Sequence, residues 1–134
     1  MAKNRLVDIF PGDMPDELVF QTLEIELEPG PVKFSAAAQR HAINRHRNDL
    51  PIIIPHLAQL ITDPTYMGDD HRNAGKIEFV SRIQGHPDAA LIALNLERGE
   101  TDGSYHVCSA YFIGQSELDK KRHKGVLKVV KRRD

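Results

Sequence analysis

The fold is decided by residues 76–113, which have the sequence KIEFVSRIQGHPDAALIALNLERGETDGSYHVCSAYFI. Apolar and polar side chains alternate from Lys76 onwards and again over 90–96. Turn residues at 84–88 and a Gly-containing loop at 98–103 separate these runs. The stretch therefore predicts successive antiparallel strands, the last of which covers 105–113.

Two helical segments are expected before these strands. Ser35 is a natural N-cap, and the alanine-rich residues 36–46 that follow contain neither Gly nor Pro. A second short helix is expected to begin near Pro55, in its first turn, and to end at Asp63-Pro64.

The two ends of the chain carry weaker patterns. Residues 1–17 contain two Pro-centred turn signals and are expected to be irregular. Strict alternation over 23–28 then predicts a half-buried strand with an acidic outer face. Near the C-terminus, Ser116 is a candidate cap for a short basic helix, and 126–130 is expected to form a final strand.

These segments together predict the α+β class, with N-terminal helices packed on a four-stranded or larger antiparallel β-sheet. A chain of 134 residues is close to the commonest size of one domain. We therefore expect a single domain, 1–134. Within it, an acidic lead-in strand and loop (1–30) precedes a core (31–134) that ends in a basic segment.

Composition narrows the class of protein. Cys108 is the only cysteine, so an internal disulfide is excluded. No stretch approaches the roughly 20 apolar residues of a membrane span, and the apolar run after the N-terminus is too short for a signal peptide. We expect a cytoplasmic protein with no membrane partner, although a secreted effector delivered without a classical signal would have the same composition.

Charge is distributed unevenly around a net value of −1. Residues 1–30 hold seven acids against two bases, whereas 31–50 and 117–134 are basic. Two basic segments that meet in one face would attract phosphate, although a solvated helix and a basic tail explain the same composition. The second segment supplies four candidate substrate-binding cations: Lys120, Lys121, Arg122 and Lys124.

Several chemistries lack their sequence motif. The chain has no phosphate-cradling Gly-rich loop, no dinucleotide fingerprint and no CxxC pair. His41 and His46 are five residues apart, which places them about 140° apart on a helix and prevents joint chelation of one ion. The Asp-Asp-His run at 69–71 lacks a partner motif, and Cys108 is expected to fill a strand interior. We therefore expect neither a metal nor a cofactor.

The first helix offers side chains suited to phosphate chemistry. His41 and Arg45 are four residues apart and lie on one face, and Arg40 and Asn44 form a second such pair. Imidazole transfers protons near neutral pH, and guanidinium binds non-bridging phosphate oxygens. The structural alternative for each histidine is an ordinary place at the surface, in the core or at the helix end.

The last strand of the meander offers two hydroxyls. Ser109 and Tyr111 are expected to point to one face, with Tyr105 and Val107 behind them. Two hydroxyls that point alike from a rigid sheet can position a phosphate or polarise an attacking group. Lys76, at the start of the first strand, offers a further cation. Ordinary strand positions are the alternative for both hydroxyls.

The order of these motifs resembles a known family. Phage-associated nucleases of the barnase–EndoU–colicin–RelE superfamily open in a way that resembles three segments here: VKFS at 32–35, HAINRH at 41–46, and a helix that ends at Asp63-Pro64. The later strands, with Ser109 and Tyr111, are similar to that family's sheet. The likeness covers roughly residues 30–130 and leaves the acidic lead-in unmatched.

The resemblance implies N-terminal helices followed by a four-stranded antiparallel sheet. It also implies metal-independent cleavage of RNA, often tRNA, by attack of the ribose 2′-hydroxyl. Glu78 departs from the family pattern, because a carboxylate on the face of Lys76 would repel a bound phosphate. The residues that match the family's catalytic positions are His41, His46, Lys76, Ser109 and Tyr111.

The sequence therefore predicts a small endoribonuclease that is toxin-like or phage-associated and acts on RNA. A cognate immunity or antitoxin protein is a further expected partner. One of the two helix histidines transfers protons, and the two hydroxyls orient the phosphate. Lys76 and Arg45 stabilise the pentacoordinate phosphorane, and Arg40 and Arg45 also bind substrate. The alternatives are a non-catalytic nucleic-acid-binding module and a phage or bacterial protein-interaction domain.

Overall fold

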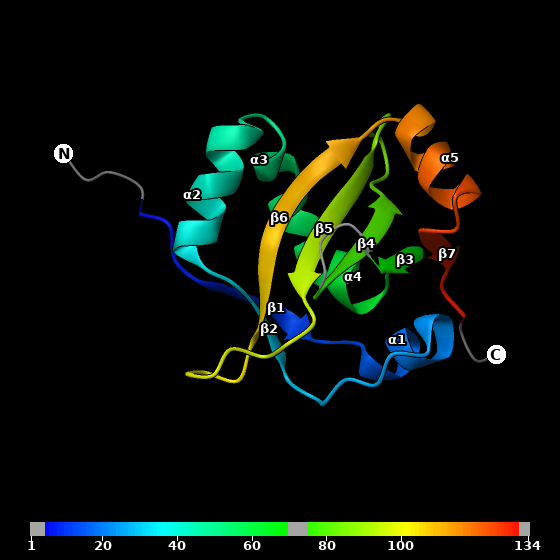
Figure 1. Ribbon diagram of the computed structural model, residues 1–134. Helices are drawn as coiled ribbons and strands as arrows, with labels where there is room; N and C mark the ends of the chain where they lie inside the picture. The colour runs from blue at the N-terminus through cyan, green and yellow to red at the C-terminus, as the bar shows by residue number, and fades with distance from the viewer. Residues whose placement is uncertain (1–4, 70–74, 132–134) are drawn as a thin grey trace.

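The structure is a computed structural model that describes residues 5–69 and 75–131, and it has the α+β class (Figure 1). Its helices are α1 (Asp16–Leu23), α2 (Ala36–Arg45), α3 (Leu50–Ile53), the 3₁₀ turn η1 (Ile54–His56), α4 (Leu57–Thr62) and α5 (Gln115–His123). Its strands are β1 (Ile9–Asp13), β2 (Pro31–Phe34), β3 (Tyr66–Asp69), β4 (Lys76–Arg82), β5 (Ala89–Asn95), β6 (Tyr105–Ile113) and β7 (Leu127–Val129).

The strands of the described residues form one sheet in the order β1-β2-β6-β5-β4-β3-β7. Strands β3 to β6 form an antiparallel meander, as residues 76–113 predicted for most of it. β2 pairs parallel to β6, through Val32 with Tyr105 and Lys33 with His106, so the sheet is mixed rather than wholly antiparallel. A parallel pair needs a long connection, which the helices and the meander between β2 and β6 provide.

The first 30 residues differ from the prediction. Residues 1–17 were expected to be irregular, but they contain the edge strand β1 and the first two residues of the helix α1. Residues 23–28, predicted as a strand, finish α1 and continue as irregular chain. The alternation nevertheless predicts burial correctly, because Ile25 and Leu27 pack on the core while the glutamates between them are exposed.

The helical section agrees closely with the sequence. The Ser35 hydroxyl oxygen caps α2 by accepting a hydrogen bond from the backbone N–H of Ala38 at 3.1 Å. The second helical segment begins earlier than predicted, at Leu50, and continues through η1 into α4 before it ends at Asp63. These short helices bury the larger hydrophobic core against the face of the sheet that points away from the viewer in Figure 1.

A β-bulge at Cys108 divides β6 into two parts. Val107 pairs with Leu94, and Ser109 pairs with the adjacent Ala93, so Cys108 is an extra residue opposite β5. Neighbouring residues of β5 point to opposite faces, and the bulge therefore reverses the alternation along β6. Val107 packs in the larger core, whereas Ser109 points to the other face.

The other face of the sheet is covered in part. Leu118 from α5 and Leu127 from β7 pack on strand residues such as Leu91 to form a smaller core. α5 begins directly after Gly114, so Ser116 is not its cap as predicted, whereas β7 lies within the predicted final strand. None of the helices in residues 5–69 and 75–131 is both long enough and apolar enough to cross a membrane.

Candidate active site

A groove of about 520 Å³ lies where α2, β6 and the first turn of α5 meet. Five of the residues predicted from the sequence border this groove, although they come from distant parts of the chain. The full lining consists of His41, Ala42, Arg45, His46, Ser109, Ala110, Tyr111 and Glu117.

The pairing of β2 explains why α2 lies beside β6. β2 pairs only with the first two residues of β6, so the rest of that edge is left to α2, as Figure 1 shows. Asp49, just after α2, fills part of this edge, because its Oδ2 accepts a hydrogen bond from the backbone N–H of Phe112 at 3.0 Å. The helix and the strand therefore form the two walls of the groove.

The helix brings its two histidines to the groove in different ways. His41 and Arg45 border the groove from one face of α2, as their spacing predicted, and both are exposed. His46 follows the last helical residue and has φ −140° and ψ 69°, outside the helical range. The separation of 140° between the imidazoles assumed a continuous helix, and it does not apply because α2 ends at Arg45.

The half-buried His46 ring is held by stacking. Its centroid lies 4.6 Å from that of the Tyr111 ring, and the two planes differ by 13°. The backbone N–H of His46 donates to the carbonyl of Ala42 at 2.8 Å and closes the last turn of α2. His46 is therefore a helix-end histidine whose ring lies against the strand and borders the groove.

Ser109 and Tyr111 share one face of β6, as predicted, and both are half-buried at the groove. The prediction that Tyr105 and Val107 lie behind them on that face is wrong. The bulge at Cys108 turns these two residues into the larger core instead. Regular alternation correctly predicted that the two hydroxyls share a face. It wrongly placed Tyr105 and Val107 on that face, because it did not allow for the bulge.

Sequence analysis missed Glu117, the carboxylate among the groove-lining residues. It is exposed in the first turn of α5, where an acid is favoured by the helix dipole. A signal for it was present: the predicted basic helix follows directly on the strand that holds Tyr111, so its first turn lies at the end of that strand.

Lys76 is not among the residues that line the groove. It begins β4, two strands from β6, and lies opposite Asn95 of β5. Cys108 Sγ donates a hydrogen bond to Asn95 Oδ1 at 3.2 Å. Burial raises the pKa of the Cys108 thiol, while the Lys76 charge and the Asn95 contact oppose the rise. The thiol therefore stays protonated near neutral pH, as expected of a packing residue.

The carboxylate of Glu78 is paired within the protein. Glu78 is only 5% exposed, and its Oε1 accepts a hydrogen bond from Lys121 Nζ at 3.1 Å. Lys121 was predicted to bind substrate, but here it joins α5 to β4 through this ion pair. Lys121 therefore compensates the negative charge of Glu78, the residue that departs from the pattern of the nuclease family.

The other predicted cations lie outside the groove. Arg122 packs over the Tyr66 ring, with its guanidinium carbon 4.9 Å from the ring centroid. Lys120 and Lys124 are exposed on and just after α5, and Arg40 is exposed on α2. None of these side chains lines the groove.

A separate charged cluster lies at the start of β6. Lys33 Nζ lies 3.1 Å from Asp102 Oδ2 and 3.7 Å from Asp8 Oδ2. The backbone N–H of Ser104 donates to Asp102 Oδ1, and this bond, followed by that from Lys33, lowers the Asp102 pKa to about 2. The cluster fastens the loop between β5 and β6 to β2.

Among the described residues, no group of three or more His, Cys, Asp and Glu side chains is placed to hold a metal ion. Asp69 ends β3, and Asp70 and His71, the other members of the sequence run considered for a metal, lie outside the described residues.

Comparisons of the chain with protein-family models, with curated proteins and with solved structures give no match. The functional argument therefore depends on the groove and the residues around it.

Proposed function

We propose that this protein is a small endoribonuclease that cleaves RNA without a metal ion, through attack of the ribose 2′-hydroxyl on the adjacent phosphate. The observation that supports this best is the convergence of two imidazoles, a guanidinium, two hydroxyls and a carboxylate on one groove. Proton transfer and phosphate binding are the two tasks of the reaction, and these groups are suited to both.

The reaction needs one group to accept a proton and another to donate one. The 2′-oxygen loses its proton as it attacks phosphorus, and the departing 5′-oxygen gains a proton. The products are a 2′,3′-cyclic phosphate and a 5′-hydroxyl. We assign one of these transfers to His46, because stacking on Tyr111 fixes its ring. The second transfer falls to His41 or Glu117, the other ionisable lining groups of suitable chemistry.

The remaining lining groups are suited to holding the phosphate. Arg45 is exposed at the rim and offers a guanidinium to the non-bridging oxygens, which gain negative charge in the phosphorane. The hydroxyls of Ser109 and Tyr111 come from a rigid strand and orient the phosphate between the two proton-transfer groups. Single-stranded or loop RNA is the substrate class we favour, tRNA loops included, because its bases can unstack onto a surface.

The arrangement of the elements supports the same proposal. Helices followed by an antiparallel meander are what the resemblance to the barnase–EndoU–colicin–RelE nucleases implies, and we extend the proposal to that fold. A toxin-like or phage-associated role in the cytoplasm, with a cognate immunity or antitoxin protein, belongs to the same hypothesis.

Incubating the purified protein with total RNA in EDTA tests the proposal. We expect cleavage, products that end in a 2′,3′-cyclic phosphate, and no cleavage where the attacking 2′-hydroxyl is replaced by hydrogen. RNA binding without cleavage, seen as a retarded band on a native gel, would favour a non-catalytic binding module. The absence of both binding and cleavage would favour a protein-interaction domain. Cleavage of the 2′-deoxy analogue would contradict the mechanism.

A further inference from the structure

A strip of half-buried polar side chains continues from the groove along the same face of the sheet towards β4. Ser109 lies at the edge of the groove, and Cys108 follows it at the bulge. The Cys108 thiol contacts the Asn95 amide, and Asn95 lies directly opposite Lys76 in the adjacent strand. Ser109, Asn95 and Lys76 therefore occupy three neighbouring strands on one face, each strand about 4.8 Å from the next.

The cation at the far end of this strip has no charged partner among the residues that the structure describes. Within the described residues, Lys76 makes no ion pair, although its side chain is half-buried. Glu78, two residues along the same strand, is paired with Lys121. Among the described residues, the Lys76 ammonium is therefore available to a phosphate.

The amide in the middle of the strip has unused hydrogen-bonding groups. The Asn95 carbonyl oxygen accepts from the Cys108 thiol, a weak donor, and its amide nitrogen has no protein partner in the described residues. A side-chain amide offers a donor and an acceptor side by side, which is the pattern that distinguishes one base edge from another. Because the strand is central in the sheet, the amide is held on a rigid support.

Building on the ribonuclease function above, we propose that Asn95 and Lys76 form a subsite for the nucleotide next to the cleaved bond. Asn95 recognises the edge of its base, and Lys76 binds its outer phosphate. This assignment replaces the role in phosphorane stabilisation that sequence analysis gave to Lys76. The enzyme then cleaves single-stranded RNA with a preference for one base beside the cut.

The subsite is tested by binding, with 2′-O-methyl homo-oligonucleotides of adenosine, cytidine, guanosine and uridine as uncleavable probes. Fluorescence anisotropy gives the four dissociation constants and their dependence on salt. The parental protein should favour one base about tenfold, and Asn95→Ala should bring the four constants together. Asn95→Asp keeps the acceptor for the Cys108 thiol but removes the amide donors, and it should also lose the preference.

Lys76→Gln should weaken all four oligonucleotides alike and reduce the salt slope by about 0.7, the share of one phosphate contact on a single strand. Lys76→Arg should restore the slope. Lys128→Gln removes an exposed lysine from β7 at the far edge of the sheet and is the matched control. A base preference that survives both Asn95 variants, an unchanged slope in Lys76→Gln, or no binding by the parental protein would overturn the subsite.

The two proposals fail in different ways. Base-selective binding through Asn95 without any RNA cleavage would remove the ribonuclease and keep the subsite. Cleavage whose base preference is the same in the parent and in both Asn95 variants would keep the ribonuclease and remove the subsite.

Discussion

The His46 imidazole and the Tyr111 phenol lie nearly parallel, with their centroids 4.6 Å apart. One ring comes from the residue that ends α2 and the other from the part of β6 beyond the bulge. The contact therefore fastens the helix to the strand and also sets the orientation of the imidazole. His46 has a structural role and a proposed chemical role, and mutagenesis can separate them.

Replacing either groove histidine should lower the rate of RNA cleavage. We expect His46→Ala to reduce the initial rate about 100-fold or more, the usual contribution of general acid–base catalysis, and His41→Ala to do the same if His41 rather than Glu117 performs the second transfer. His41 is exposed, so its removal should change the free energy of unfolding by no more than about 0.5 kcal/mol. His46→Ala should cost about 0.5–1.5 kcal/mol through the lost stack. Initial rates and thermal melts measure both effects.

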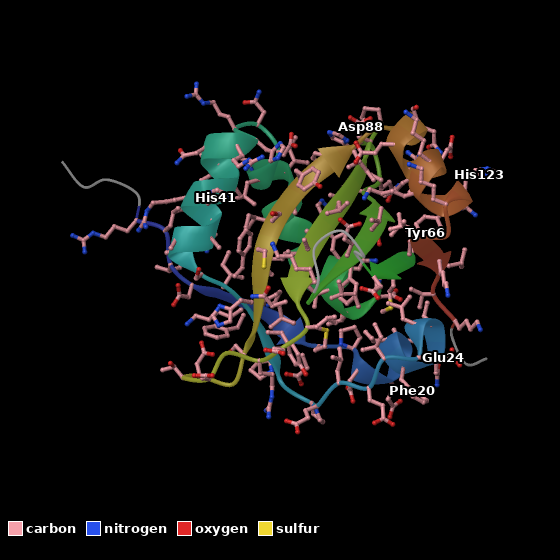
Figure 2. All side chains as sticks on the ribbon, in the orientation of Figure 1. Phe20, Glu24, His41, Tyr66, Asp88 and His123 are labelled. Carbon is pink, nitrogen blue, oxygen red and sulfur yellow. The ribbon has the colours of Figure 1, made fainter. Side chains whose placement is uncertain are left out.

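His123→Ala is the matched control for both variants. Figure 2 shows His123 on α5, on the opposite side of the molecule from His41 on α2. This control should cleave at the parental rate. Parental rates in folded His41→Ala and His46→Ala proteins would show that the proposed site is wrong.

Glu117 can be tested for a part in proton transfer. If it performs the second transfer, Glu117→Gln should lower kcat about 100-fold and leave KM nearly unchanged. If it only repels the phosphate, the same change should lower KM and leave kcat intact. Asp119→Asn, on the same helix but outside the groove lining, is the control. Steady-state kinetics on a defined RNA separate these outcomes.

The ion pair of Glu78 with Lys121 should matter for stability. Lys121→Met leaves a buried carboxylate without its partner and should cost about 3 kcal/mol in free energy of unfolding. The double variant Glu78→Gln with Lys121→Met should recover most of this loss, because no unpaired charge remains. Lys120→Met, an exposed neighbour, should be nearly neutral. Urea denaturation compares the four proteins, and equal losses in the single and double variants would contradict the pairing.

The Asp102 cluster predicts a specific acid titration. The folded-state pKa of Asp102 is lowered from 3.8 to about 2. A lowered folded pKa means that the stabilising contribution is complete above pH 3.8 and is lost as the pH falls through 2. Carboxyl-carbon NMR should show this midpoint. Lys33→Met should raise it only in part, since the Ser104 N–H remains the first cause. A midpoint near 3.8 in the parental protein would contradict the contact.

Local patterns predicted the elements that local interactions stabilise. The Ser35 cap and the alanine-rich residues after it were sufficient for α2, alternation was sufficient for β4 and β5, and the loop at 98–103 indicated β6 as the next strand. The pairing of His41 with Arg45, and of Ser109 with Tyr111, followed from helix and strand geometry alone. The sequence therefore predicted the helix half and the strand half of the candidate site separately, but not how the two halves meet.

The rest depends on contacts between distant residues. Pro11 and Gly12 indicated a turn, but they are tolerated in β1 because it is an edge strand, and Gly12 has φ +136° where the pairing with β2 is irregular. The alternation over residues 23–28 predicted which side chains are buried. This segment does not form a strand, because it pairs with none of the strands in the described sheet. The Glu78–Lys121 pair required α5 to be placed on the sheet, which no short pattern specifies, whereas the position of Glu117 could have been inferred from the helix that follows β6 directly.

The bulge at Cys108 has a consequence for the length of the chain. With one extra residue, β6 directs Val107 to the interior and Ser109 to the groove. Removing Cys108 would leave Val107 opposite Leu94 and Ser109 opposite Ala93 as neighbours in a regular strand, so both side chains would keep their faces. A strand one residue shorter at this point would therefore keep Val107 in the core and Ser109 at the groove, and it would lose the thiol that contacts Asn95.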